Sequence, residues 1–468
     1  MALRRDLNLL ETAALSIAIM APTAAMALNG SLSANLAGAA ATLSFLGALT
    51  TVVFIAYAFT TFCKRYATTG SVYAFVSRGL GVRVGFLSGW ALLFTYFAFS
   101  VGSAGEVGLF FQTFVGLLGG SVPWILPSLV ALALILGLGL RRLELGTRVT
   151  LIVEGISVTL ILITVIVILA HLGTHAVSAT PFKLPHGIGL SSVGLASIFG
   201  FLSFAGFEGA AVLGEESHNP TRAIPRAIWI AVFGCGIFYL LVIYTQSLGF
   251  GLGAAGVKAF GGSSDPMVQL TGKYAGHAFA VILAAGACVS AYAAAFGSTI
   301  ATSRLLLTFG RDGLMTRRFA DINPRGAPSI AIFASAALPA VAVVIWFLYG
   351  TPAVSIFGDF GTIGVLALLL AYLTTQIAAI KLFAGREWRG LKLIIPIVAI
   401  ILIGYAFYAN VWPVPPAPGR YFPYIVLLWL IVGLALSFMR PDAIRAVALE
   451  LSETKDEPTN RSAVILDD

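Results

Sequence analysis

The sequence predicts an all-α polytopic membrane protein with twelve transmembrane helices. Hydrophobic residues make up 59% of the 468-residue chain and charged residues only 10%, whereas a soluble domain carries about 25% charged residues. Apolar windows of about 20 residues, the length needed to cross the hydrocarbon core of a bilayer, recur along the chain. These observations exclude a soluble globular protein, and the lipid bilayer is the expected partner.

The apolar windows define the expected helices in order. We place the spans near residues 13–35, 42–62, 85–112, 122–140, 148–170, 192–214, 227–248, 278–303, 329–348, 354–381, 392–411 and 421–438. The longest external connections are expected near 171–191 and 249–277. No connection is long enough to form a separate domain.

Lysine and arginine are distributed unevenly between the alternating loops. Of the 28 such residues, only Lys183, Lys258, Lys273 and Arg420 fall on one side of the membrane. Because cytoplasmic loops carry an excess of Lys and Arg, we expect both termini to be cytoplasmic and the protein to lie in the cell membrane. The net charge of +8 does not indicate nucleic-acid binding, since the charges lie between apolar runs rather than on one face.

Two of the predicted spans contain helix breakers near mid-membrane. Pro22 removes a backbone donor within the first span and clashes with the preceding turn. The segment 203–207 (SFAGF) lies at similar depth in the sixth span, which runs in the opposite direction. A matched pair of interrupted spans is typical of a transporter binding site. The alternative is the ordinary tolerance of membrane helices for Pro and Gly.

Broken helices at membrane depth offer backbone groups as ligands. The N-terminus of a half-helix presents free N–H groups and a positive dipole end, which suit a carboxylate. Exposed carbonyl groups at the other half-helix suit an ammonium group. The two breaks therefore predict a site for the α-amino and α-carboxyl groups of an amino acid, built without charged side chains.

Three stretches of the chain resemble the amino acid–polyamine–organocation superfamily of permeases. They are FAGFEGAAVLGEESHNPTRAIPRAI (204–228), YATTGSVYAFVSRGLGVRVGFLSGW (66–90) and ATSRLLLTFGRDGLMTRRFADINPRGAP (301–328). The resemblance implies the LeuT-type fold, a five-plus-five inverted repeat with two added helices. The implied regions are a cytoplasmic N-terminus (1–12), the first repeat (13–170), the second repeat (192–381), the added helices (392–438) and a disordered cytoplasmic tail (439–468).

The resemblance also implies where the substrate binds, between helices 1 and 6. The corresponding residues here are Ala21, Pro22, Thr23, Ala24, Ala25 and Met26, together with Ser203, Phe204, Ala205, Gly206 and Phe207. Phe201, Phe204 and Phe207 are candidates for an aromatic lid, with helix packing as the alternative for each.

Two features depart from the superfamily pattern. The sequence APTAA replaces the glycine-rich motif of helix 1, and Ser157 stands where some members carry a lysine that substitutes for sodium. A lysine-based coupling mechanism is therefore not available. Ser157 and Ser290 are candidates for an ion or coupling site.

Four acidic residues lie within the predicted spans. A charged side chain at the bilayer centre costs at least about 2.5–3.5 kcal/mol, so each is a functional candidate. Glu208 directly follows the second break, and we hypothesise that its protonation is coupled to the shape of that break; a structural, neutral carboxyl group is the alternative. Glu106 and Asp359 are candidates for an outer vestibule or for binding a cationic group. Glu154 has a plainer explanation, pairing with an arginine on the inner side.

These features predict a secondary transporter for an amino acid or a related amine that works by alternating access. Proton-coupled uptake is the first expectation and obligate exchange the alternative, with sodium coupling less favoured. The three cysteines show no metal-binding spacing, and no cofactor is expected. A polytopic enzyme is disfavoured because the five histidines are not paired with carboxylates, and a channel because no filter motif repeats.

Overall fold

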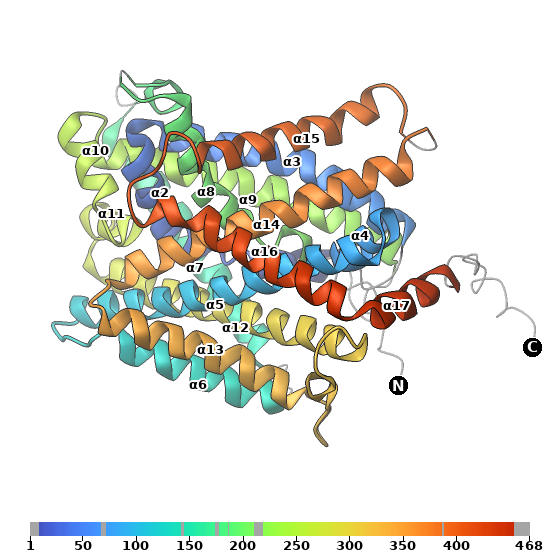
Figure 1. The fold of residues 1–468 in the computed structure, drawn as a ribbon. Coiled ribbons are helices and arrows are strands. Elements are labelled where there is room, and N and C mark those ends of the chain that lie inside the picture. The colour runs from blue at the N-terminus through green and yellow to red at the C-terminus, as the bar shows by residue number, and fades with distance from the viewer. Residues whose placement is uncertain are drawn as a thin grey trace, which may run out of the picture.

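The structure is a computed structural model that describes residues 9–66, 72–141, 145–173, 177–185, 187–209, 219–385 and 388–453. Long helices lie roughly side by side in one bundle (Figure 1). Within the described ranges, β-type pairing is limited to an isolated bridge between Ala384 and Trp388. The all-helical fold predicted from composition is confirmed.

The helices of the first half follow the predicted apolar windows closely. They are α1 (Leu9–Ile19), α2 (Pro22–Ala37), η1 (Gly38–Ala40), α3 (Ala41–Arg65), α4 (Val72–Leu80), α5 (Val82–Leu117), α6 (Ile125–Arg141), α7 (Leu145–Leu172), η3 (Thr180–Phe182) and α8 (Leu190–Phe204). The first predicted span is thus two helices, α1 and α2, separated at Met20–Ala21.

The second half adds short helices to the connections between long ones. Its elements are α9 (Pro220–Phe250), α10 (Ala254–Gly261), α11 (Pro266–Tyr274), α12 (His277–Arg311), η5 (Arg317–Ala320), α13 (Ser329–Leu348), α14 (Ala353–Phe383), α15 (Leu391–Ala409), η6 (Gly419–Tyr421), α16 (Phe422–Met439) and α17 (Pro441–Glu453). The predicted connection 249–277 contains α10 and α11, which lie at the opposite end of the bundle from α4 and α17 (Figure 1).

Ten segments of the described chain are long and apolar enough to cross a membrane, and the shorter apolar helix Ile125–Arg141 lies beside them. One of the ten, Pro22–Arg65, contains both α2 and α3. The protein is therefore a multi-pass membrane protein. The number twelve stays a prediction, because it depends on how α2, α3 and α6 are counted.

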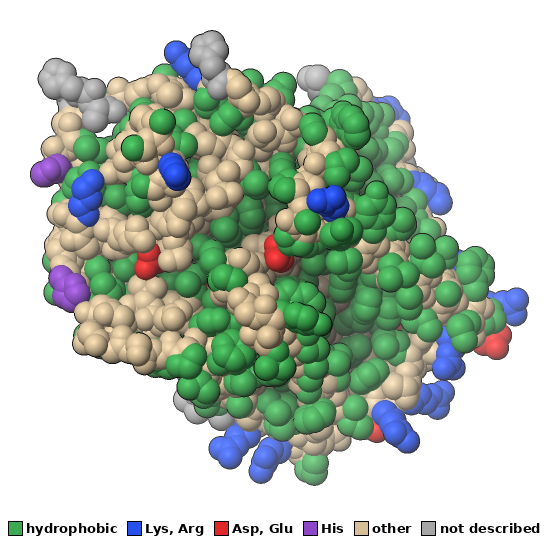
Figure 2. Space-filling view, turned by 60° about the vertical axis from the view of Figure 1, so that its left-hand side comes forward, with side chains coloured by type: hydrophobic (Ala, Val, Ile, Leu, Met, Phe, Trp, Pro, Cys, Tyr) green, Lys and Arg blue, Asp and Glu red, His purple; other side chains and the backbone are tan. Residues whose placement is uncertain are grey.

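The surface of the bundle is suited to lipid. Leu348, Leu428 and Ile401 expose 77%, 63% and 62% of their surface. Figure 2 shows hydrophobic side chains over much of one face, with Lys and Arg mostly toward its margins. An apolar surface of this extent in a soluble monomer would cause aggregation, whereas in a bilayer it contacts acyl chains.

Helix α5 forms the centre of the bundle, with α12 and α14 packed along it, while α2 packs against α8 and α3 against α8 and α9. Small residues permit these close approaches, as is usual in membrane helices. A Cβ atom added at Gly200 would lie 2.5 Å from the Cβ of Ala48, and one at Gly364 would lie 2.5 Å from the Phe99 ring. Close packing of side chains against glycines on neighbouring helices therefore holds the core together.

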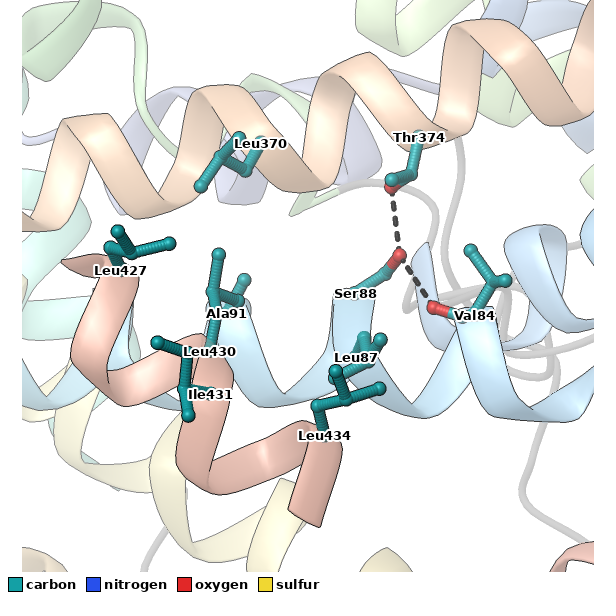
Figure 3. A pocket seen from close by; sticks show the side chains of 10 residues that line it. All are labelled: Val84, Leu87, Ser88, Ala91, Leu370, Thr374, Leu427, Leu430, Ile431 and Leu434. Atoms are coloured by element: carbon teal, nitrogen blue, oxygen red, sulfur yellow. Dashed lines mark hydrogen bonds between the residues drawn. The ribbon is translucent and has the colours of Figure 1, made fainter. Parts of the chain in front are cut away.

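Helix α16 is fastened to α5 by two tryptophans. Each indole Nε1 donates to the other's backbone carbonyl at 2.8 Å, Trp90 to Trp429 and Trp429 to Trp90, and the rings stack with centroids 4.5 Å apart. Beside them, a largely apolar pocket of about 290 Å³ lies between α5, α14 and α16. A hydrogen bond of 2.7 Å between Ser88 and Thr374 crosses one end of it (Figure 3). None of the residues that line it belongs to the predicted site.

The prediction of a disordered tail over 439–468 is wrong for its first part. Residues Pro441–Glu453 form α17, and residues 454–468 lie outside the described part of the chain. Pro441 starts the helix, a position that proline favours, and Ala443, Ile444 and Val447 share one helical face. Ala443 and Ile444 pack against the core. The acidic and polar composition that suggested disorder is concentrated further along the chain.

Candidate functional site at two helix breaks

The first break is a strained turn between α1 and α2. Ala21 has φ 45° and ψ 59° and is the only non-glycine residue with positive φ in the described ranges. This left-handed conformation costs an L-residue roughly 1–2 kcal/mol. Pro22 opens α2, where its fixed φ suits the first turn and its missing N–H leaves no donor unsatisfied. The surrounding helices therefore hold this turn in place.

The backbone donors of the first turn of α2 all have partners. The Thr23 N–H donates to Oε1 of Glu154 at 2.7 Å, and the Ala24 N–H donates to Oγ of Ser290 at 3.1 Å. The Ala25 N–H donates to the Ala21 carbonyl at 3.0 Å. The expectation of free N–H groups at this half-helix is therefore wrong for α2, because side chains of α7 and α12 occupy them.

Glu154 of α7 contacts the first break. Its side chain is only 5% exposed, and its Oε1 atom accepts a hydrogen bond from the Thr23 amide. Pairing of Glu154 with an arginine stays a prediction. The side chain of Arg148 lies outside the described residues. The side chain of Glu154 therefore supplies an acceptor for the first turn of α2, where a helix has N–H groups without an intrahelical partner.

The second break follows α8, which ends at Phe204. Gly206 has φ 97°, a conformation that glycine adopts readily and other residues do not. A single 3₁₀ turn covers residues 207–209, and the Gly209 N–H donates to the Gly206 carbonyl at 2.8 Å. The half-helix expected beyond Gly209 falls on residues 210–218, which lie outside the described part of the chain.

The two breaks are in direct contact. Oγ of Ser16 in α1 donates to the Phe207 carbonyl at 3.0 Å, and Nδ2 of Asn29 in α2 donates to Oγ of Ser203 at 2.8 Å. Ile19, the last residue of α1, packs so closely on Gly206 that an added Cβ would lie 2.6 Å from its Cγ2. Segments 191 residues apart in sequence are thus brought together at one site.

Glu208 lies in an aromatic enclosure beside the second break. Its side chain is 8% exposed, and Oε2 accepts a hydrogen bond of 2.8 Å from the Tyr372 hydroxyl of α14. The rings of Phe59, Phe207 and Tyr372 pack in pairs with centroids 5.5–5.6 Å apart. Tyr96 of α5 lies within electrostatic reach of the carboxyl group. The Glu208 carboxyl group is therefore shielded from bulk water, and its neighbour Tyr372 has a phenol hydroxyl that can either donate or accept a hydrogen bond.

Sequence reasoning missed Phe59, Tyr96 and Tyr372. Tyr372 had a usable signal: a single phenol within the aliphatic run VLALLLAY (365–372) needs a hydrogen-bond partner once buried. Which partner it would find depends on how α14 packs against the second break. That contact spans 164 residues of sequence.

The three candidate lid residues have different surroundings. Phe204 packs edge-to-face on Tyr239 of α9 with ring centroids 5.2 Å apart, and Phe201 is 3% exposed within the main core. Phe207 alone of the three belongs to the aromatic enclosure of Glu208.

The remaining candidates are spread over the neighbouring helices. Ser290 binds the first break, whereas Oγ of Ser157 donates to the Val153 carbonyl at 2.8 Å and packs against Gly286. The Met26 carbonyl accepts a hydrogen bond of 2.7 Å from Gln246 Nε2. In the described ranges, no group of three or more His, Cys, Asp or Glu residues could hold a metal ion.

Glu106 and Asp359 lie in different environments. Glu106 of α5 is 2% exposed, and its Oε1 atom has no hydrogen-bond partner among the described residues. Glu106 and Glu154 lie within electrostatic reach of each other. Asp359 of α14 is partly exposed, and within the described chain no hydrogen bond joins it to either break. The structure thus associates Glu106, but not Asp359, with the carboxylate that caps α2.

Comparison with known proteins gives a consistent result. A family profile described as amino acid permease matches residues 7–436. The chain is 27% identical over 344 residues to the branched-chain amino acid permease BcaP of Bacillus subtilis. The aligned region covers 69% of this chain and 70% of the relative. It is 24% identical over 447 residues to the low-affinity putrescine importer PlaP of Escherichia coli, covering 92% of each.

A third relative carries a different cargo. The methylthioribose transporter of Bacillus subtilis is 26% identical over 340 residues, covering 69% of this chain and 70% of the relative. The family consists of transporters rather than enzymes, and the match extends over nearly the whole chain. The chain belongs to the amino acid permease family of the amino acid–polyamine–organocation superfamily.

Proposed function

We propose that the protein is a secondary transporter that carries an amino acid or a related amine across the cell membrane by alternating access. The proposal includes twelve spans in the LeuT-type arrangement, with inverted repeats over 13–170 and 192–381 and two added helices over 392–438. Both termini are cytoplasmic. The uneven distribution of Lys and Arg supports this orientation.

One observation carries the proposal: the strained first break and the glycine-based second break touch each other within the membrane, beside a buried carboxyl group. Irregular backbone at membrane depth is tolerated where it faces protein or lines a cavity. The proposed substrate site comprises Ala21 to Met26 and Ser203 to Phe207, and the hydrogen bonds from Ser16 to Phe207 and from Asn29 to Ser203 beside them support it. The named cargoes of the relatives, branched-chain amino acids and putrescine, supply the first substrates to test.

Proton coupling through Glu208 is the proposed driving mechanism. The carboxyl group accepts a hydrogen bond from Tyr372, lies near Tyr96 and adjoins the second break. Loss or gain of a proton at Glu208 changes which of these contacts is favourable, and therefore changes the preferred geometry of residues 205–209. Obligate exchange is the alternative, in which substrate on the opposite side replaces the proton as the driving partner.

The test is uptake of labelled leucine and putrescine into proteoliposomes at a series of external pH values. We expect acid-stimulated uptake by the wild type, and Glu208→Gln to abolish the pH dependence while retaining exchange of internal for external substrate. Tyr372→Phe should slow uptake about tenfold, because the buried carboxyl group loses its donor. Asp442→Asn, a substitution at a surface residue of α17, is the control.

Three results would overturn this proposal in part or altogether. Full pH-dependent uptake by Glu208→Gln would exclude Glu208 as the coupling group. Uptake by the wild type only when unlabelled substrate is enclosed in the vesicle, without effect of pH, would replace symport by obligate exchange. If enclosed substrate never accelerates the flux of labelled substrate, the protein does not work by alternating access.

A further inference from the structure

The pocket between α5, α14 and α16 lies on the outer surface of the bundle, away from both helix breaks. It has a volume of about 290 Å³, and its walls are mostly leucine, isoleucine, valine and alanine side chains (Figure 3). On α16, Leu427, Ile431 and Leu434 line it while exposing 54%, 53% and 40% of their surface. The pocket is therefore open to the acyl chains of the surrounding bilayer.

The helices that form the pocket are fastened to each other. Trp90 of α5 and Trp429 of α16 each donate a hydrogen bond of 2.8 Å to the other's backbone carbonyl. Ser88 of α5 and Thr374 of α14 are joined by a hydrogen bond of 2.7 Å (Figure 3). Separating these helices would leave polar groups unpaired in hydrocarbon, which is costly. The pocket is therefore a fixed feature of the packing.

The length of the pocket matches part of one acyl chain. Its residues on α5 run from Val84 to Ala91, and those on α16 run from Leu427 to Leu434. Seven residues of helix rise about 10 Å, which is a third of the ~30 Å hydrocarbon core. The end near Val84 adjoins the first turn of α5, where the exposed side chain of Arg83 marks the membrane surface.

Arg83 and Phe438 stand at this end of the pocket. The guanidinium group of Arg83 stacks on the Phe438 ring, with Cζ 4.3 Å from the ring centroid. Arg83 precedes the pocket residue Leu87 by four positions, and residues four apart share a helix face. Phe438 follows the pocket residue Leu434 by the same interval. The stacked pair continues two walls of the pocket by one turn, and it leaves the in-plane N–H groups of Arg83 available to a phosphate.

A second exposed cation continues the third wall. Lys381 follows the pocket residue Thr374 by seven positions, which is about two helical turns, so both lie on one face of α14. The salt bridge found in the described chain joins Asp442 and Arg445 of α17 at 3.9 Å. Within that part of the chain, neither Arg83 nor Lys381 has a carboxylate partner. Both charges are therefore available to an anion from outside the protein.

We propose that this pocket binds an anionic phospholipid of the leaflet on the α17 side, which is the cytoplasmic leaflet in the proposed orientation. One acyl chain lies along the apolar walls, Arg83 binds the phosphate, and Lys381 adds a second positive charge. Basic pockets between membrane helices bind anionic headgroups in the same way, through opposite charge at the surface and apolar contact beneath it. The lipid site is separate from both helix breaks, and it does not depend on which substrate the protein transports.

Lipids that differ in their headgroup or in their chains test the two halves of the site. Delipidated full-length protein in detergent is titrated with anionic dioleoyl phosphatidylglycerol or zwitterionic dioleoyl phosphatidylcholine, and native mass spectrometry gives the apparent Kd of the first bound lipid. We expect the wild type to bind phosphatidylglycerol at least about fivefold more tightly, the contribution of one surface cation. Dihexanoyl phosphatidylglycerol should bind roughly tenfold or more weakly than the dioleoyl lipid, because it buries fewer methylene groups.

Two pairs of variants assign the contacts. Arg83→Gln should reduce the affinity for phosphatidylglycerol about fivefold without changing that for phosphatidylcholine. Its control is Arg420→Gln, which removes an exposed arginine beside the Tyr421 ring at the other end of α16 and should change neither. Ile431→Trp places an indole in the pocket and should weaken both lipids. Leu428→Trp, at an exposed position of α16 outside the pocket, is its control.

The alternative occupants give different results, each of which would overturn the proposal. Equal affinity of the wild type for the two dioleoyl lipids would mean that the pocket holds ordinary bilayer lipid. Unchanged affinity for phosphatidylglycerol in Arg83→Gln would place the anion elsewhere, and equally tight binding of the dihexanoyl lipid would exclude the pocket. A dimer that Ile431→Trp dissociates and Leu428→Trp does not would assign the pocket to a second copy of the chain. The wild-type comparisons decide even if Ile431→Trp does not fold.

Discussion

The two helix breaks touch each other but are maintained by different means. At the first break, a non-glycine residue, Ala21, is held at φ 45° while side chains of α7 and α12 bind the exposed amides. At the second, Gly206 reaches φ 97° through its own conformational freedom, and the polar group beside it is a side chain, Glu208, bound to a phenol of α14. The first break combines a strained residue with backbone amides that all have partners, and the second combines a glycine with a buried carboxyl side chain.

This difference indicates which break is the fixed one. Moving α2 would separate the Thr23 and Ala24 amides from Glu154 and Ser290, leaving polar groups unpaired in a medium without water. Moving residues 205–209 breaks the side-chain hydrogen bonds from Tyr372 to Glu208 and from Ser16 to the Phe207 carbonyl, but Gly206 can rotate there with little steric cost. We therefore expect the second break to change shape more readily than the first during transport.

The largest expected effect comes from removing the freedom of Gly206. Gly206→Ala should destabilise the protein by about 2–4 kcal/mol, since an L-residue at φ 97° is strained and the added methyl group has to displace a neighbouring side chain. Its Cβ would lie 2.6 Å from Cγ2 of Ile19. The measurement is the apparent melting temperature of the purified protein, together with its uptake rate.

The chain offers a matched control for this substitution. Gly234 lies in the middle of α9, and an added Cβ there would contact nothing within 4 Å. Gly234→Ala should be neutral or stabilising by up to about 1 kcal/mol, as for other glycines in helices. Equal effects of the two substitutions would show that the second break does not depend on glycine geometry.

The sequence was a good guide to the helices and a partial guide to the site. Apolar windows located the long helices because a run of about 20 apolar residues in a protein is typically a membrane-spanning helix. Pro22 and Gly206 marked both breaks because proline lacks a donor and glycine alone adopts positive φ at little cost. These properties belong to single residues and are visible without a fold.

The partners of the breaks were not predictable in the same way. Glu154 appeared as an isolated carboxylate in an apolar run, and its contact with Thr23 spans 131 residues of sequence. The hydroxyl group of Ser290 reaches Ala24 across 266 residues. Such contacts depend on the packing of α7 and α12 around α2, which periodicity along a single helix does not encode.

Relieving the strain at Ala21 should change stability less than Gly206→Ala does, and should increase it rather than decrease it. Ala21→Gly should raise stability by up to about 1 kcal/mol, because glycine avoids the cost of the left-handed conformation while paying more chain entropy on folding. Ala27→Gly, within α2, should instead destabilise by about 1 kcal/mol. Thermal unfolding of the two variants side by side measures the difference. A loss of stability in Ala21→Gly as large as in Ala27→Gly would mean that the first break carries no strain.

The smallest effect is expected at Asp265, a carboxylate outside both breaks and outside the spans. Its Oδ1 accepts a hydrogen bond of 2.6 Å from Gln269 Nε2, and its Oδ2 accepts one of 3.1 Å from Thr113 Oγ1. Burial raises the pKa of Asp265 above its ordinary value of 3.8, although the two hydrogen bonds partly offset this shift. Asp265 therefore shows what burial does to a carboxylate in this protein when no helix break is nearby.

The raised pKa of Asp265 fixes the sign of its pH dependence. The folded protein holds this proton more tightly than the unfolded chain, so the contribution of Asp265 to stability is greatest below pH 3.8 and falls as the pH rises through the raised pKa. Asp265→Asn never ionises, and it should be more stable than the wild type at pH 7.5, by less than about 1 kcal/mol because the site is partly exposed. The advantage should disappear near pH 4, as measured by apparent melting temperature in matched buffers. A stability difference between the two proteins that stays constant from pH 4 to 7.5 would contradict this prediction. It would show that the hydrogen bonds to Thr113 and Gln269, rather than burial of the charge, determine how Asp265 affects stability. Burial would then also be a poor guide to the protonation of Glu154 and Glu208.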